Sequence, residues 1–177
     1  MRRGFLPLAL PEFDEGEPDL TPRPASASAT VLSQMMEIEH ANNAGNVHGG
    51  TILRLVDGAA GIAAIKHARR RVVTAAIDEM SFLAPVFIGD VLTVRAMVND
   101  AHRSSMEIGV KVMTEKLLTG ERLHTCSAYL TFVAVDREGR AIAVAPVIPE
   151  TEDEIRRYRQ AGERREYRLA MRNRLKT

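Results

Sequence analysis

The chain has 177 residues, of which 45% are hydrophobic and 27% are charged. This composition is ordinary for a soluble protein, and the length allows one domain with a sizeable core. The formal net charge of +1 gives no whole-chain argument for nucleic acid as a partner. The single cysteine, Cys126, excludes an internal disulfide and fits a reducing compartment.

Residues 1–28 are predicted to form a flexible tail, because prolines interrupt any helix and the stretch ends in Pro-Ala-Ser-Ala-Ser. The first residues make a poor signal peptide, since prolines break their short apolar part and acidic residues follow at once. No run in the chain reaches the roughly 18 apolar residues that a membrane-spanning helix needs. We therefore expect a cytoplasmic protein that binds neither membrane nor nucleic acid.

The folded domain is predicted to cover residues 29–149. A first strand is expected at residues 30–38, and a loop rich in Asn and Gly follows at residues 40–47. Residues 48–65 then form one helix that begins at His48-Gly49-Gly50 and is apolar on nearly every side. Basic residues at 66–71 suit its C-terminal end. A helix that is apolar all round is normally buried.

Four strand-like stretches follow the helix, at residues 72–83, 92–99, 106–112 and 125–134. Three of them alternate apolar and polar residues, and short turns join them. Such strands pair antiparallel and bury one face. Because a single helix precedes them, the pattern predicts an α+β fold in which the sheet wraps around one central helix.

The last segment, residues 150–177, is predicted to be a charged surface helix. Thr151 and Glu154 have the spacing of a capping box, acidic residues crowd the first turn, and arginines fill the rest. Because this helix has little apolar face, we expect it to pack weakly.

Asp57 lies in the middle of the apolar helix, where an ionised carboxylate is costly unless it is paired or hydrogen-bonded. It shares a helix face with Gly50, about 10 Å away along the axis, and with Gly61. Glycine inside a helix costs roughly 1 kcal/mol relative to alanine, so a strand, a partner subunit or a ligand is expected to approach this face closely. The alternative interpretation is a surface ion pair with Arg54, worth a few tenths of a kcal/mol.

The tripeptide His48-Gly49-Gly50 also has two interpretations. It is either a loop that needs glycine conformations or a helix N-terminus whose free N–H groups polarise a carbonyl or bind an anion. A polarised carbonyl within reach of a carboxylate is what acyl hydrolysis requires. The pattern does not name the acyl group.

Residues 42–61, with the sequence NNAGNVHGGTILRLVDGAAG, resemble the active-site segment of hotdog-fold acyl-CoA thioesterases, most closely the cytosolic acyl-CoA hydrolase branch. Further similar segments are residues 72–74, 80–90, 105–107, 132–136 and 149–152. The resemblance covers residues 29–168. Many relatives have Glu at the position of Gly58, and no role is assigned to this difference.

The resemblance implies a hotdog fold, in which a five-stranded antiparallel sheet wraps around the central helix. It also implies hydrolysis of fatty acyl-CoA to free fatty acid and CoA, with no cofactor apart from the CoA of the substrate and product. The expected assembly is a homodimer with its active sites at the interface, which in the family is often built further into a trimer of dimers.

The resemblance also implies roles for individual residues. Asp57 of one subunit would act as general base or as nucleophile, and Asn42 of the other subunit would position the water or the carbonyl. The Gly50 N–H would polarise the thioester carbonyl, with His48 and Gly49 shaping the turn.

Phosphates of CoA suit arginine, and Arg103, followed by Ser104 and Ser105, is the candidate for binding the CoA part of the substrate. The Arg69–Arg71 run and the C-terminal arginines are further candidates. For any single arginine a solvated basic face is the more frequent explanation, and Ser104 and Ser105 could equally form a turn. The histidines are scattered and form no metal site. Cys126 falls in the core-facing register of its strand, which argues against a catalytic thiol.

Two other functions remain open at this stage. A non-catalytic hotdog module could bind acyl-CoA without hydrolysing it, although it would have no evident use for Asp57. A hotdog dehydratase is disfavoured because no catalytic histidine is paired with that acid. Neither the acyl chain length nor the choice between CoA and acyl carrier protein follows from the sequence.

Overall fold

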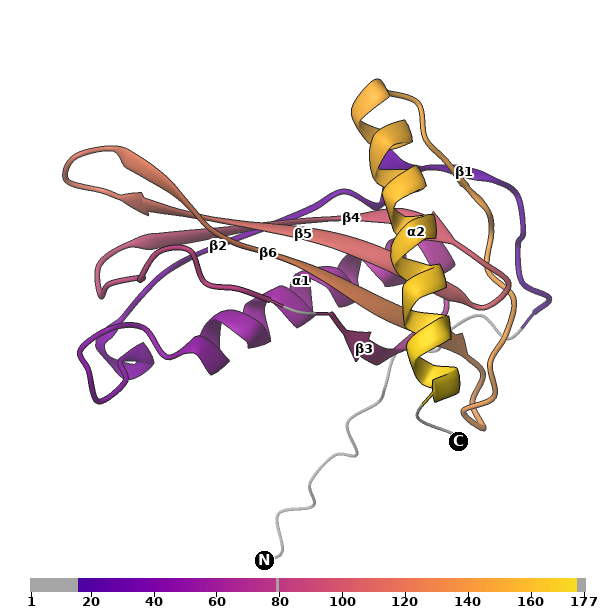
Figure 1. Cartoon of the computed structure of the whole chain (residues 1–177), viewed down its shortest axis with the longest axis horizontal. Helices are drawn as coiled ribbons and strands as arrows, with labels where there is room; N and C mark the ends of the chain where they lie inside the picture. Colours follow the sequence, from indigo (N-terminus) through magenta and orange to yellow (C-terminus); the bar gives the residue numbers. More distant parts are fainter. Residues whose placement is uncertain (1–15, 79, 175–177) are drawn as a thin grey trace, which may run out of the picture.

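Five long strands and two helices make up most of the computed structural model, which describes residues 16–78 and 80–174 (Figure 1). In chain order the elements are β1 (Arg23–Pro24), the 3-10 helix η1 (Ala25–Ser28), β2 (Thr30–Met35), the 3-10 helix η2 (Ile38–His40), α1 (Gly49–Ala68), β3 (Arg71–Ile77), β4 (Val91–Ala101), β5 (Ser105–Lys116), β6 (Glu121–Val135), β7 (Val147–Ile148) and α2 (Glu152–Arg174).

The five long strands form one sheet in the order β2-β4-β5-β6-β3, and every neighbouring pair is antiparallel. The sheet curves around α1, while α2 crosses its other face (Figure 1). Small side chains of α1, such as Ala60 and Ala63, are buried against strand residues such as Val94, Ile108 and Leu130. The predicted α+β architecture, a sheet around one central helix, is confirmed.

The central helix is less covered than its composition predicts. Ile62 and Ile65 are exposed, and Leu53 and Leu55 are only half-buried. The sheet of one chain covers one side of α1 and leaves the other side open. The expectation of burial all round is therefore wrong for a single chain, because an apolar surface does not reveal which molecule covers it.

The N-terminal segment that the sequence assigns to a flexible tail is packed over its last part. Residues 1–15 lie outside the described residues. β1 pairs in parallel with β7, and the Arg23 guanidinium donates to the carbonyl oxygen of His67. Ser28 Oγ accepts a hydrogen bond of 2.9 Å from the backbone N–H of Val98. Residues 23–28 thus belong to the folded body, because they supply hydrogen bonds to α1 and β4.

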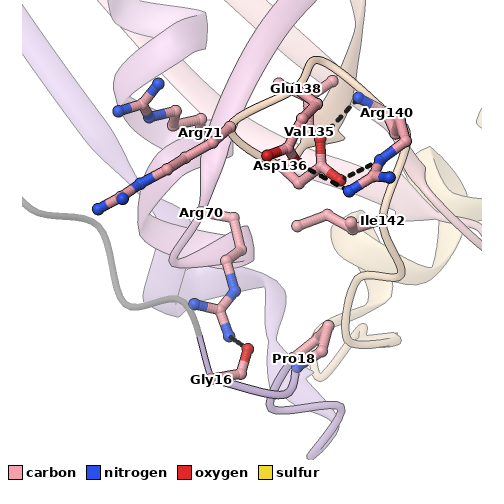
Figure 2. Close-up of a pocket in the computed structure, with 10 residues that line it drawn as sticks. Gly16, Pro18, Arg70, Arg71, Val135, Asp136, Glu138, Arg140 and Ile142 are labelled. Atoms are coloured by element: carbon pink, nitrogen blue, oxygen red, sulfur yellow. Dashed lines mark hydrogen bonds and ion pairs between the residues drawn. The ribbon is translucent and has the colours of Figure 1, made fainter.

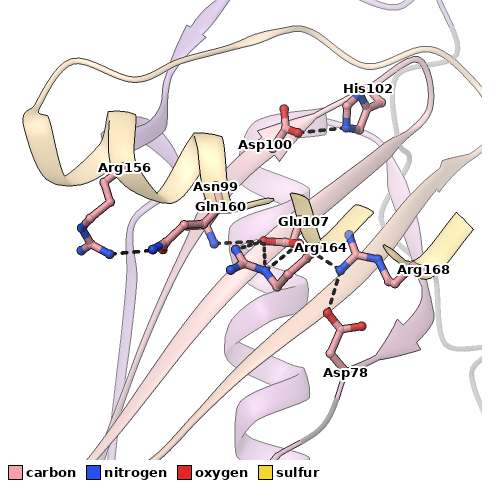
Figure 3. A network of polar contacts seen from close by, with 9 residues as sticks. All are labelled: Asp78, Asn99, Asp100, His102, Glu107, Arg156, Gln160, Arg164 and Arg168. Carbon is pink, nitrogen blue, oxygen red and sulfur yellow. Dashed lines mark hydrogen bonds and ion pairs between the residues drawn. The ribbon is translucent and has the colours of Figure 1, made fainter. Parts of the chain in front are cut away.

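The C-terminal helix is anchored far more firmly than predicted. Its capping box is present, since Thr151 Oγ1 accepts from the N–H of Glu154 and Glu154 Oε2 accepts from the N–H of Thr151. Further along, Arg164 and Arg168 bind the buried Glu107 of β5, with closest N–O distances of 2.6 and 3.0 Å (Figure 3). The prediction of weak packing is wrong, because ion pairs to a buried acid replace the missing apolar face.

Candidate active site

The N-terminus of α1 is closed by the side chain of its own N-cap. His48 Nδ1 accepts a hydrogen bond of 2.9 Å from the backbone N–H of Gly50. In this conformation the Gly50 N–H, which the sequence predicts to be the carbonyl donor, is engaged by the imidazole. Within the described part of the chain, the N–H of Gly49 has no hydrogen-bond acceptor, so it is the donor of this turn that remains to bind a ligand.

Asp57 is half-buried on α1 and is held from the neighbouring strand. Thr74 Oγ1 on β3 donates a hydrogen bond of 2.8 Å to Asp57 Oδ1. The ion pairs among the described residues include none between Asp57 and Arg54, so the alternative interpretation of the acid does not hold. Sequence reasoning gave Thr74 no role. The similarity of residues 72–74 to the corresponding segment of the thioesterases was the one sequence feature that pointed to Thr74.

Asn42 organises the loop before α1. Its Oδ1 accepts hydrogen bonds from the N–H groups of Ala44, at 2.8 Å, and Asn46, at 3.2 Å. This is the Asx-turn role that asparagine often has in loops. Because Oδ1 is occupied, the side-chain NH₂ is the part of Asn42 that remains to donate outward; it has no partner among the described residues.

A cavity of about 280 Å³ opens beside this helix N-terminus. Asn42 and Gly49 supply polar groups to its wall, and the other lining residues are mostly apolar: Asn46, Val47, Ile52, Phe82, Leu83, Ala84, Pro85 and Val86. Asp57 does not line it, since the acid lies two turns further along α1. On one chain, the residues predicted to act together are therefore split between two places.

The predicted CoA-binding residues lie at the opposite end of the helix. Arg103 and Ser104 lie in the turn between β4 and β5, and Ser105 begins β5; the Arg103 carbonyl accepts from the N–H of Val144. His67 near the C-terminus of α1 contacts the adjacent Ala145. A helix of this length spans about 30 Å. Within one chain, the turn between β4 and β5, with Arg103, Ser104 and the adjoining Ser105, thus lies far from the start of α1 (Figure 1).

A second cavity, of about 420 Å³, lies beyond the C-terminal end of α1 (Figure 2). Its arginines already bind oxygen atoms of the protein. Arg70 donates to the carbonyls of Gly16 and Glu17, and Arg140 pairs with Asp136 and Glu138. This wall is rich in charged side chains and lies at the C-terminal end of α1, away from the N–H groups of the helix start, so it is the weaker candidate for an acyl site.

Other chemistries find little support at these positions. Cys126 is buried, and burial raises the pKa of its thiol to about 11, so it is not an activated nucleophile. The described residues contain no group of three or more His, Cys, Asp or Glu side chains that could hold a metal ion. Among these residues, no helix combines the length and the apolar character needed to cross a membrane.

Known proteins with similar sequences and structures belong to the family that the sequence of this chain resembles. Residues 44–121 match the family model described as Thioesterase superfamily. An uncharacterized acyl-CoA thioester hydrolase of Bacillus subtilis is 41% identical over 123 residues, which cover 70% of this chain and 72% of the relative.

Two solved structures are similar over most of their length. A hexameric acyl-CoA thioesterase, solved in its apo form, superposes with a TM-score of 0.82 at 38% identity, covering 85% of this chain and 97% of that one. An acyl-CoA hydrolase of Staphylococcus aureus, solved with butyryl-CoA, CoA and CoA disulfide, has a TM-score of 0.81 at 36% identity, with 88% and 95% covered.

The hotdog sheet around one central helix agrees with the family match, and the acyl-CoA thioester hydrolases among the relatives identify the class as a thioester hydrolase. The chain belongs to the thioesterase superfamily, as the resemblance of its sequence implies.

Proposed function

We propose that this protein hydrolyses acyl-CoA to a free acid and CoA, at sites that two copies of the chain share. The observation that carries the proposal is the half-buried carboxylate of Asp57, which Thr74 of the edge strand β3 holds on the helix whose Ile62 and Ile65 are left exposed. The names of the relatives, which are acyl-CoA hydrolases and thioesterases, support the choice of substrate.

In this proposal Asp57 accepts a proton from a water molecule as that water attacks the thioester carbonyl. The negative charge that develops on the carbonyl oxygen is stabilised by a backbone N–H at the start of α1, from Gly49 or Gly50, and by the NH₂ group of Asn42. The C–S bond then breaks, and the CoA sulfur takes the proton from Asp57. In the second version of the mechanism, Asp57 attacks directly and water hydrolyses the resulting anhydride.

Related structures support this set of residues. The Staphylococcus aureus hydrolase was also solved as alanine variants of one asparagine, one aspartate and one threonine. These three residues have the same spacings along that chain as Asn42, Asp57 and Thr74 have along this one. The match argues that the three residues form one functional group here as well.

The proposed dimer joins two chains along β3. This strand is an edge of the sheet, and its Val73 is 49% exposed; Ile62 and Ile65 of α1 are also exposed. A two-fold axis there would pair the two edges and lay the two α1 helices side by side in opposite directions. The N-terminus of one helix, with Asn42, would then face Asp57 of the other.

The same arrangement gives the remaining candidates a role. A partner helix running in the opposite direction places its C-terminal end, and the turn with Arg103, Ser104 and Ser105, near the first chain's Gly49. We keep these three residues as proposed ligands of CoA across the interface. The hexameric relative supports further assembly into a trimer of dimers.

The test is release of free thiol from acyl-CoA by the Asp57→Asn variant, which keeps the size of the side chain. Loss of a general base reduces turnover by about 10²- to 10⁴-fold, while the oligomeric state and the unfolding midpoint should not change. Hydrolysis at the wild-type rate would overturn the role of Asp57. Thermal stabilisation by CoA without any thiol release from the wild-type protein would instead favour the binding module.

A further inference from the structure

The cavity at the N-terminus of α1 has the character of an acyl-chain pocket. Gly49 lines it, and the Gly49 N–H, which has no acceptor among the described residues, is the group proposed to bind a thioester carbonyl. Beyond this point the wall is apolar, because Val47, Ile52 and Val86 contribute buried side chains. A carbonyl held at the polar mouth would direct the attached hydrocarbon along the apolar wall.

The size of the cavity limits the chain that fits. A volume of about 280 Å³ is at the small end of the range of ligand pockets, which run from about 300 to 1,000 Å³. A methylene group takes about as much space as a water molecule in the liquid, roughly 30 Å³. On one chain this volume corresponds to on the order of nine carbons, which is less than a long fatty acyl chain.

Phe82 lies in the wall of this cavity next to the start of α1. The edge of its ring lies 3.5 Å from where a Cβ of Gly49 would be, so the ring stands over the first residue of α1 and beside the proposed carbonyl position. The side chain is 47% exposed and comes from the irregular segment between β3 and β4. Among the lining residues it is the largest side chain.

The segment that carries Phe82 is fixed at several points. Asp78 at its start pairs with Arg168 of α2 at 2.6 Å, the N–H of Leu83 donates to the Thr125 carbonyl, and the Val86 carbonyl accepts from the N–H of Val47. A wall held in this way is pre-formed, and a pre-formed wall can discriminate between chain lengths.

We propose that this cavity binds the acyl chain of the substrate and that Phe82 sets its length, so that the enzyme prefers short- and medium-chain acyl-CoA of up to about nine carbons. This inference rests on the proposed acyl-CoA hydrolysis. It predicts that removing the ring extends the pocket, and that filling the wall from Ala84, which faces the same cavity, shortens it.

The experiment measures kcat/KM for acetyl-, butyryl-, octanoyl-, dodecanoyl- and palmitoyl-CoA by release of free thiol. For the wild-type protein, kcat/KM should decline for acyl chains longer than octanoyl. Phe82→Ala should raise the ratio of kcat/KM for dodecanoyl-CoA to that for butyryl-CoA about tenfold, since one methylene in an apolar pocket is worth 10-fold or more. Ala84→Leu should lower the ratio of octanoyl to butyryl activity. Phe87→Ala is the matched control, because Phe87 is similarly exposed, at 44%, in the same segment but does not line the cavity.

A binding measurement separates this inference from the proposed function. The Asp57→Asn protein, with and without Phe82→Ala, is titrated calorimetrically with butyryl-CoA and with dodecanoyl-CoA. A gain in dodecanoyl-CoA affinity on losing the ring supports the pocket even if no variant hydrolyses its ligand. The inference is wrong if Phe82→Ala, like Phe87→Ala, ranks the acyl-CoA substrates by kcat/KM and by affinity in the same order as the wild-type protein does. It is also wrong if palmitoyl-CoA is the best substrate of the wild-type protein.

Discussion

Thr74 donates a hydrogen bond of 2.8 Å to Asp57, and this contact joins the edge strand β3 to the middle of the central helix. A carboxylate that is held at one oxygen presents the other in a defined direction. The contact therefore links the edge of the sheet, where a second chain is proposed to bind, to the acid proposed to act in hydrolysis.

The first prediction concerns this hydrogen bond. Thr74→Val keeps the shape of the side chain and removes the donor, so kcat should fall about tenfold, as expected for an exposed hydrogen bond to a charged group, with little change in KM. Thr74→Ser retains the hydroxyl and should recover most of the rate. Steady-state kinetics with butyryl-CoA measure both values. Equal rates for Thr74→Val and the wild-type protein would assign Thr74 a purely structural role.

The second prediction concerns the N-cap of α1. His48→Ala removes the acceptor of the Gly50 N–H and should lower the free energy of unfolding by about 1 kcal/mol. His48→Asn provides a side-chain oxygen at the same place and should restore most of the stability. Urea unfolding of the three proteins gives the comparison. If His48→Asn is as unstable as His48→Ala, the imidazole stabilises the turn by some other contact.

Much of this fold was predictable from periodicity, because the alternation in β4, β5 and β6 depends on which face of a strand meets the core. The central helix was predictable because a glycine-rich start and a basic end bracket its apolar stretch. Its open side was not predictable in the same way, since Ile65 is apolar whether its own sheet or another chain covers it.

Two further features could not be found from local patterns. The contact between Thr74 and Asp57 depends on how β3 lies across α1, which the spacing of the two residues does not encode. The packing of α2 depends on Glu107, which looks like a solvent-facing residue of an alternating strand until Arg164 and Arg168 are brought to it. Apolar periodicity does not report such long-range ion pairs.

The third prediction concerns the proposed interface. Val73→Asp places a charge on the open edge of β3 and should convert the dimer to monomers and abolish most thiol release, because each site would lose its partner half. Val31→Asp is the matched control, since Val31 is 59% exposed on β2, the opposite edge of the sheet. Light scattering on a sizing column reports the mass of each variant. A Val73→Asp protein that remains dimeric and active would place the interface elsewhere.

The fourth prediction concerns the anchor of α2. Glu107→Ala leaves two arginines without their buried partner and should lower the free energy of unfolding by about 3 kcal/mol. Glu115→Ala, whose partner Arg122 is solvent-exposed, should change it by less than about 1 kcal/mol. Urea unfolding measures both, and limited proteolysis should cut α2 faster in Glu107→Ala alone. Similar losses in the two variants would show that the network adds no more than a surface pair.

The last prediction concerns the pH dependence of stability through His67, which is buried near the C-terminus of α1. Its Nε2 lies 2.9 Å from the Ala145 carbonyl and therefore donates to it, so a second proton would have to go to the buried Nδ1. Burial, together with the nearby Arg23 charge, lowers the pKa of His67 below its ordinary value of 6.5. Protonation is thus disfavoured in the folded chain.

The sign of the effect follows from the proton balance. As pH falls below 6.5, the unfolded chain takes up this proton before the folded one does, so stability falls by up to about 1.4 kcal/mol per pH unit until the folded state also protonates. His67→Gln keeps a donor for Ala145 and cannot titrate, so it should lose less stability than the wild-type protein between pH 7.5 and about 5. Urea unfolding across that range tests this, with His124→Gln as a control at an exposed histidine. Parallel profiles for His67→Gln and the wild-type protein would contradict the assignment.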